Sequence, residues 1–194
     1  MSKLAGIVLA AGTSSRFGAD NKLLAGYGGQ AMVRSVVEAA LATDLDPVVV
    51  VTGHDADNVR EALGGLDVVF AHNAEFATGQ AGSLKTGIAA VPQSCAGAMI
   101  LLADMPDVNA EIINHLLDEF AGEACIVVPQ HQGVRGNPVI LGRENFAGLE
   151  ETCGDKGARD LLTGDNVRMV DVDSEAVLRD FDTPDSLKGD GFDF

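Results

Sequence analysis

The sequence predicts an α/β protein of three layers, in which helices cover both faces of a doubly wound, mostly parallel sheet. Short apolar runs alternate with segments of helical periodicity over roughly the first 130 residues. Runs such as Val48–Val51 and Ile100–Leu102 are apolar without alternation, which is typical of strands buried on both faces. No repeat or change in composition divides the 194 residues, so a single domain over 1–194 is expected.

The strands follow from the runs of Val, Ile, Leu and Ala. In chain order they are expected over Ala5–Ala10, Val48–Thr52, Val68–Ala71, Ala98–Leu102, Ala124–Val128, Val139–Leu141 and Val167–Val172.

Helices are expected between these strands, where apolar residues recur at helical spacing. One apolar stripe runs from Met32 to Leu41, and a second runs from Ile112 to Phe120 behind a capping residue at Asn109. Another helix should begin near Asp55 or Asp57 and end at the glycine pair that follows. Ligands of such sheets bind beyond the carboxyl ends of the strands, so functional residues are expected in the loops after each strand.

The charge balance limits the kind of partner. The chain has 13 Lys and Arg against 29 Asp and Glu, a formal net charge of -16, with 46% hydrophobic residues. This composition is that of a folded domain, and it argues against nucleic-acid or anionic-membrane partners, which need clustered basic residues. A phosphate-bearing ligand would therefore need a local group of cations, together with a divalent cation.

Cysteine usage and hydropathy indicate a cytoplasmic protein. Cys95, Cys125 and Cys153 are far apart and lack zinc spacing, so they are expected to be free thiols. No apolar run approaches the ~18 residues of a membrane span. The first residues enter a strand-like run without the pattern of a signal peptide.

The loop after the first strand collects groups that bind anions. Glycines at Gly12 and Gly18 allow tight turns, hydroxyls at Thr13, Ser14 and Ser15 donate hydrogen bonds, and Arg16 and Lys22 carry positive charge. The loop matches neither G-x-x-x-x-G-K-[ST] nor G-x-G-x-x-G. On spacing alone, an ordinary strand-to-helix turn remains an equal alternative.

This loop resembles the signature of the MobA-like NTP transferases, within which it is most similar to the molybdenum cofactor cytidylyltransferases. The resemblance rests on Leu9-Ala10-Ala11-Gly12-x-Ser14-x-Arg16-x-Gly18 followed by Lys22, and it extends to Asp185. It implies a Rossmann-like nucleotidyltransferase fold and a loop that wraps a nucleoside triphosphate, with Arg16 and Lys22 on the phosphates. The Ala-Ala-Gly form favours CTP, because the related guanylyltransferases usually have Ala-Gly-Gly.

Two acidic motifs match the metal-binding positions of that family. Asp104 directly follows a buried strand and precedes Pro106, so it should project at the carboxyl edge of the sheet, where a carboxylate suits Mg²⁺. The late segment Asp180–Pro184 resembles the Asp-x-Asp-Thr-Pro motif and implies Asp182 as the second ligand, with Asp180 as the alternative. Helix capping at Asp104 and an acidic surface tail are the other interpretations.

Three further segments match the family in the same order. Gly82 and Ser83, in Gly79–Lys85, are expected at a helix N-terminus beside the nucleotide, although a capped helix start explains them nearly as well. The resemblance places two other segments against the acceptor substrate. Their expected contact residues are Arg135, Gly136, Asn137, Asp155, Lys156 and Arg159.

The function implied is transfer of CMP from CTP to the terminal phosphate of a molybdopterin-type acceptor, with Mg²⁺ as cofactor and a molybdoenzyme as the expected recipient. The acceptor phosphate is itself a nucleophile, and the sequence has no convincing Ser–His or Cys–His pair. The alternatives are a different NTP, a sugar or alcohol phosphate acceptor, and a maturation factor that binds the cofactor without catalysis. A dinucleotide-dependent oxidoreductase is disfavoured by the missing glycine fingerprint.

Overall fold

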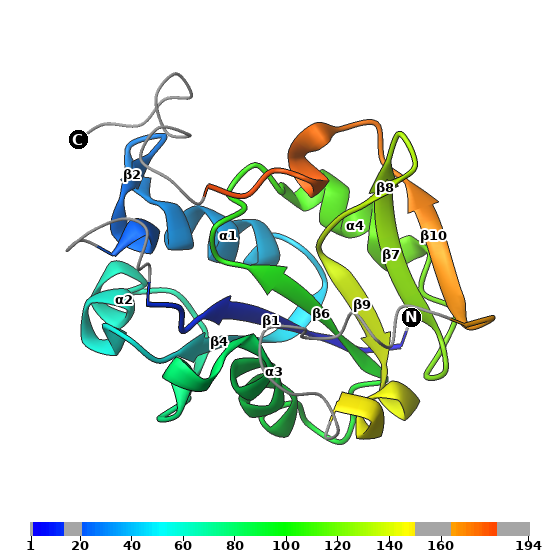
Figure 1. The fold of residues 1–194 in the computed structure, drawn as a ribbon, viewed down its shortest axis with the longest axis horizontal. Coiled ribbons are helices and arrows are strands. Elements are labelled where there is room, and N and C mark those ends of the chain that lie inside the picture. The colour runs from blue at the N-terminus through cyan, green and yellow to red at the C-terminus, as the bar shows by residue number, and fades with distance from the viewer. Residues whose placement is uncertain (1, 14–20, 150–163, 182–194) are drawn as a thin grey trace.

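The computed structural model describes residues 2–13, 21–149 and 164–181 of the chain. Over these ranges strands alternate with helices (Figure 1). The helices are α1 (Met32–Leu41), α2 (Ala56–Ala62), α3 (Gln80–Ala89) and α4 (Ala110–Asp118). The strands are β1 (Leu4–Ala10), β2 (Gly26–Tyr27), β3 (Gln30–Ala31), β4 (Leu45–Thr52), β5 (Val69–His72), β6 (Gly97–Leu102), β7 (Ile126–His131), β8 (Val134–Arg135), β9 (Val139–Gly142) and β10 (Val167–Asp171).

In the part of the chain that the structure describes, the main sheet has eight strands in the order β10-β7-β9-β6-β1-β4-β5, with β8 paired to the end of β7. Strands β4 and β6 flank β1 in parallel register, β5 continues parallel to β4, and β10 lies parallel to β7. Strand β9 runs antiparallel to both β6 and β7. The sheet is therefore mostly parallel, with β9 reversed near its middle and the short β8 antiparallel to β7, which confirms the predicted fold class.

Helices cover both faces of this sheet, as Figure 1 shows for α1 and α4 on one side and α3 on the other. Successive side chains of β1 point to opposite faces of the sheet, so they belong to two separate core clusters. Val8 and Ala10 pack with α1, α2 and α4, whereas Ala5 and Ile7 pack with α3 on the opposite face. The apolar run Val48–Val51 of β4 contributes to both clusters, because its side chains are buried on alternate faces.

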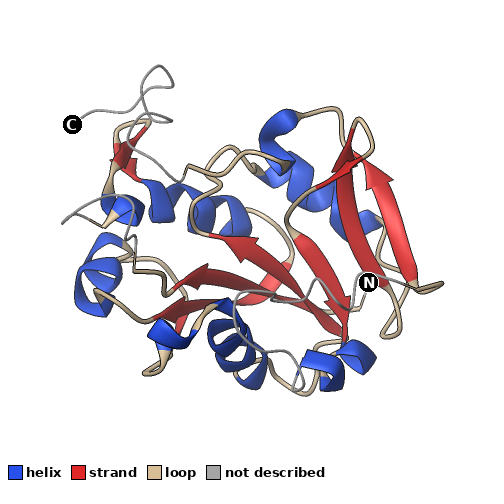
Figure 2. Cartoon of the chain, viewed as in Figure 1, coloured by secondary structure: helices blue, strands red, loops and turns tan. Residues whose placement is uncertain are grey.

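The elements expected from hydrophobic pattern agree with the structure, with shifted ends. Strand β7 begins at Ile126 and continues to His131, later than the expected Ala124–Val128. Asn109 caps α4 by accepting a hydrogen bond from the Ile112 amide at 3.0 Å, as predicted. The short strands β2, β3 and β8 were not expected, and they are coloured with the other strands in Figure 2. Two-residue strands offer too few positions for an alternating pattern to be detected.

In the described part of the chain, no helix combines the length and the apolar composition needed to cross a bilayer.

Candidate active site

Sequence-distant segments meet at one edge of the sheet because of its register. The ends of β1, β4 and β6 lie side by side, with Ala10 opposite Thr52 and Leu9 opposite Leu102. Strand β9 is reversed, so its first residue, Val139, pairs with Ile100 near the same edge. The loops after β1, β4 and β6, and the segment before β9, are therefore neighbours in space.

The loop after β1 is described as far as Thr13, and it rests against the loop after β4. The His54 amide donates to the Ala11 carbonyl oxygen at 3.3 Å. Gly53 makes this approach possible, because a Cβ there would lie 2.6 Å from the Phe76 Cβ and 2.9 Å from the Ala11 oxygen. The start of the loop is thus fixed by backbone contacts, and Gly12 and Thr13 are exposed.

Lys22 is carried by a short 3₁₀ helix, η2 (Lys22–Leu24), whose position is set by Asn21. The Asn21 side chain accepts a hydrogen bond from the Leu23 amide at 3.1 Å and donates to Asp55 at 3.2 Å. Because Asp55 stands at the start of α2, this contact ties η2 to the loop after β4. The capping arrangement leaves the Lys22 side chain directed toward the end of β6.

The Lys22 ammonium meets the Asp104 carboxylate there. The distance from Lys22 Nζ to Asp104 Oδ2 is 2.7 Å, and the two side chains are 12% and 21% exposed. Of the expected phosphate-binding and metal-binding groups, these two are thus brought together across 82 residues of sequence. The pair is largely screened from water, so its electrostatic attraction is stronger than that of a surface pair.

The backbone around Asp104 is held by hydrogen bonds from two directions. The Ala103 amide donates to the Leu9 carbonyl at 3.2 Å, which ties the turn to β1. The Phe181 amide donates to the Asp104 carbonyl at 3.0 Å. Phe181 is fully buried and precedes Asp182 directly, so the C-terminal segment is anchored beside Asp104 up to the residue before the expected second ligand.

The segment before β9 packs closely against the residues that follow β10. The Asn137 amide donates to the Val177 carbonyl at 2.8 Å, and the Gly136 amide donates to the Pro129 carbonyl at 2.8 Å. A Cβ at Gly136 would lie 2.2 Å from the Val177 oxygen, so only glycine fits this approach. Gly136 and Asn137 are half-buried and Arg135 is exposed on β8, which leaves the side chain of Arg135 accessible.

Gly82 and Ser83 lie in the first turn of α3. Ser83 is buried, and its hydroxyl oxygen accepts a hydrogen bond from the Asn73 amide group at 3.0 Å. A Cβ at Gly82 would lie 3.3 Å from the same Asn73 nitrogen. This contact joins the start of α3 to the end of β5, so the Ser83 side chain supports the loop rather than pointing outward.

Comparison with known protein families identifies the family of this chain. Residues 6–171 match the family model described as the MobA-like NTP transferase domain. The chain belongs to the MobA-like NTP transferase family. Rv0371c from Mycobacterium tuberculosis is 32% identical, with a TM-score of 0.81 and 95% of each chain covered. A structure titled as Rv0371C in complex with manganese is 29% identical, with a TM-score of 0.73 and 89% of each chain covered.

A curated relative of this MobA-like chain is longer. The protein named Bifunctional protein GlmU from Francisella tularensis subsp. novicida is 28% identical over 160 residues, covering 80% of this chain and 34% of the relative. The chain thus spans about a third of that protein's length.

Several expected site residues of the MobA-like chain lie outside the described residues. They are Ser14, Ser15, Arg16, Asp155, Lys156, Arg159 and Asp182. Within the three described ranges, no group of three or more His, Cys, Asp and Glu side chains is arranged to hold a metal ion. Asp104 and the alternative ligand Asp180, which is exposed, are the expected metal ligands that fall within the described residues.

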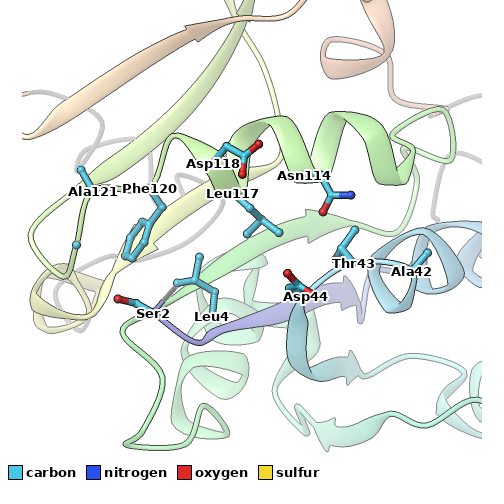
Figure 3. A pocket seen from close by; sticks show the side chains of 11 residues that line it. Ser2, Leu4, Ala42, Thr43, Asp44, Asn114, Leu117, Asp118, Phe120 and Ala121 are labelled. Carbon is cyan, nitrogen blue, oxygen red and sulfur yellow. The ribbon is translucent and has the colours of Figure 1, made fainter.

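A groove of about 710 Å³ lies at the opposite, amino-terminal edge of the MobA-like sheet (Figure 3). Leu4 and Leu117 line its apolar part, and Asp44 and Asp118 stand in its walls. Among the described residues that line it there is no Lys or Arg. None of the described residues expected to contact nucleotide, metal or acceptor lines this groove.

Proposed function

We propose that this MobA-like chain transfers CMP from CTP to the terminal phosphate of a molybdopterin-type acceptor and releases pyrophosphate. The observation that carries the proposal is the contact of 2.7 Å between Lys22 and Asp104 at the carboxyl edge of the sheet. The contact brings the cation proposed to bind phosphate to the carboxylate proposed to bind the metal, and a nucleotidyl transfer between two anions needs both groups. The choice of CTP and of molybdopterin rests on the motif resemblance.

The charge of the reactants defines what the chain must supply. A triphosphate and a phosphate acceptor repel each other, and the chain itself has a net charge of -16. Lys22, Arg16 and the backbone amides of the first loop would offset this repulsion and stabilise negative charge on the departing pyrophosphate. Because the acceptor phosphate attacks the α-phosphorus directly, no side chain has to act as a general base.

The surroundings of Asp104 suit a divalent cation. Its carboxylate oxygens are hard ligands, one of them already faces the ammonium of Lys22, and the side chain is 21% exposed. The hydrogen bond from the Phe181 amide brings the segment that leads to Asp182 next to Asp104. Asp104 and Asp182 would hold Mg²⁺, which would neutralise negative charge on the phosphates.

The acceptor would be held by the segment before β9. Arg135 is exposed, while Gly136 and Asn137 are fixed by their hydrogen bonds to Pro129 and Val177. An exposed guanidinium on a rigid turn suits a phosphate or a carboxylate, because both accept its paired N–H groups. Asp155, Lys156 and Arg159 are proposed to contact the phosphate of the same acceptor.

The test is pyrophosphate release measured with CTP, GTP, ATP and UTP in turn, with Mg²⁺ and molybdopterin present. The proposal expects the highest kcat/KM with CTP, and a product in which CMP is joined to molybdopterin. Asp104→Asn provides the inactive control, because it retains the shape of the side chain without the charge that binds the metal.

The other outcomes separate the alternatives. Preferred turnover of another nucleotide would overturn the choice of CTP, and turnover with a sugar or alcohol phosphate would overturn the choice of acceptor. Tight molybdopterin binding without pyrophosphate release from any of the four nucleotides would favour a non-catalytic maturation factor.

A further inference from the structure

Asp107, which no sequence motif singles out, joins three segments of the chain. Its Oδ1 atom accepts a hydrogen bond from the Tyr27 hydroxyl, and its Oδ2 atom lies 3.4 Å from the Arg179 guanidinium. The three residues come from β2, from the turn after β6 and from the C-terminal segment. The sequence separations are 80 residues to Tyr27 and 72 residues to Arg179.

Each of these segments carries a group of the proposed site. Tyr27 lies shortly after Lys22, and Asp107 lies in the turn that begins with Asp104. Arg179 is three residues before Asp182. Asp107 therefore connects the segment that carries Lys22 and the turn that carries Asp104 to the segment that leads to Asp182.

An aromatic contact reinforces the connection. The Tyr27 and Phe181 rings lie 6.1 Å apart between centroids, and the Arg179 guanidinium lies 4.9 Å from the Phe181 ring centroid. Phe181 is buried with Met32 of α1, and its amide donates to the Asp104 carbonyl. Burial of Phe181 anchors the segment, and the two contacts of Asp107 orient it.

The Asp107 carboxylate suits this role better than a neutral side chain would. Its side chain is 21% exposed, and it accepts from a hydroxyl and a guanidinium at different oxygens. Hydrogen bonds to a carboxylate are stronger than bonds between neutral groups and restrict the geometry of both donors. The Arg179 side chain is 43% exposed, and an ion pair with a partner in contact with water contributes little to stability, so the main effect of Asp107 falls on geometry rather than on folding.

We propose that Asp107 is a positioning residue that holds Asp104, Lys22 and the segment before Asp182 in the arrangement needed to bind a divalent cation. The proposal rests on the proposed function, because it assigns the metal to Asp104 and Asp182. The positioning role goes beyond the proposed function, because it names a carboxylate that touches neither metal nor nucleotide and acts through Tyr27 and Arg179.

The experiment compares Asp107→Asn and Tyr27→Phe with Asp118→Asn, which removes an exposed carboxylate at the opposite edge of the sheet. Mn²⁺ is the probe, and its dissociation constant is measured by electron paramagnetic resonance. Loss of a residue that orients metal ligands typically weakens binding or activity by about 10-fold to 100-fold. Asp107→Asn is therefore expected to raise the Mn²⁺ dissociation constant about tenfold, Tyr27→Phe less, and Asp118→Asn not at all.

Two further measurements separate positioning from folding. Hydrogen exchange at the Phe181 amide reports directly on its bond to Asp104, and it is expected to accelerate in Asp107→Asn. The melting temperature is expected to stay close to that of Asp118→Asn. Pyrophosphate release is expected to lose kcat, with a smaller change in the KM for nucleotide.

The results distinguish the two proposals. If the wild type binds Mn²⁺ and Asp107→Asn binds it equally well with unchanged Phe181 exchange, the positioning role is overturned and the proposed function stands. If the wild type neither binds Mn²⁺ nor releases pyrophosphate, the proposed function is overturned and the positioning role falls with it. A loss of Mn²⁺ affinity matched by general unfolding would also overturn the positioning role, because Asp107 would then act through stability alone.

Discussion

Carboxylates at the two edges of the central sheet have different surroundings. At the carboxyl edge, Asp104 and Asp107 face the cations Lys22 and Arg179, and each contact joins segments more than 70 residues apart in sequence. At the amino edge, Asp44 and Asp118 stand in a groove whose described lining residues include no Lys or Arg (Figure 3).

The difference shows how a chain with a net charge of -16 can prepare a site for an anion. It contains 13 Lys and Arg, so cations must be concentrated where a phosphate is to be bound. Loops after parallel strands converge at one edge, so a few residues from distant parts of the sequence suffice there. The following changes test whether the carboxyl edge and the amino edge differ in function.

Asp104→Asn is expected to have the largest effect. Without the carboxylate charge, Mg²⁺ loses a ligand and phosphate charge goes uncompensated, so pyrophosphate release should fall by about a thousandfold or more. The matched change Asp118→Asn at the amino edge should leave turnover unchanged. Steady-state kinetics with both variants provides the measurement, and circular dichroism checks that each is folded. Retained turnover in Asp104→Asn would remove this residue from the metal site.

Phe181→Ala is expected to have the largest effect on stability. Phe181 is fully buried, so truncation should lower the free energy of unfolding by about 3 kcal/mol. Phe120 lines the amino-edge groove and is half-buried, so Phe120→Ala should cost less. Urea unfolding of both variants gives the comparison. An equal cost at the two positions would show that the C-terminal segment is not anchored by Phe181.

The sequence predicted the central layer of the fold because burial leaves a local pattern. The runs at Val48–Thr52 and Ala98–Leu102 are apolar on both sides, and only a strand covered by helices on both faces requires this. The ends of β7 shifted because its last residues, Gln130 and His131, are half-buried and polar. Direction of pairing leaves no such pattern, so the reversal of β9 could not be deduced from its three or four apolar residues.

The site was predictable only where a single segment carries its own signal. Asp104 follows a buried strand, and Lys22 follows a glycine-containing loop, so both were expected at the same edge. Tyr27, Asp107 and Arg179 were not identified, because each acquires its role from partners that tertiary structure brings to it. The apolar Phe181 between two acids is a signal that sequence reasoning passed over, since one buried residue in an acidic stretch indicates an anchor.

Lys22→Met is expected to have an intermediate effect. The variant retains the aliphatic length of Lys22 but not its charge, so it loses a charge-assisted contact with phosphate worth about 1.5–3 kcal/mol. The dissociation constant for the triphosphate should therefore rise by about 10-fold to 100-fold. Lys3→Met at the amino edge is the control and should leave the dissociation constant for the triphosphate unchanged. Isothermal titration calorimetry measures both, and equal affinities in all three proteins would show that Lys22 does not contact phosphate.

The pair of Lys3 and Asp46 at the amino edge should give the smallest effect, visible only at alkaline pH. The hydrogen bond to Asp46, with N and O 2.8 Å apart, raises the pKa of Lys3 above its ordinary value of 10.5. A raised pKa means that the pair stabilises the fold while Lys3 is protonated, and that this contribution disappears as the pH rises through the folded-state pKa. Wild type should therefore be slightly more stable than Lys3→Met at pH about 9, with the difference closing as the pH rises through the raised pKa of Lys3. Urea unfolding across this range measures the difference, and a gap that widened with pH would contradict the assignment, because it would require Lys3 to stabilise the fold in its neutral form.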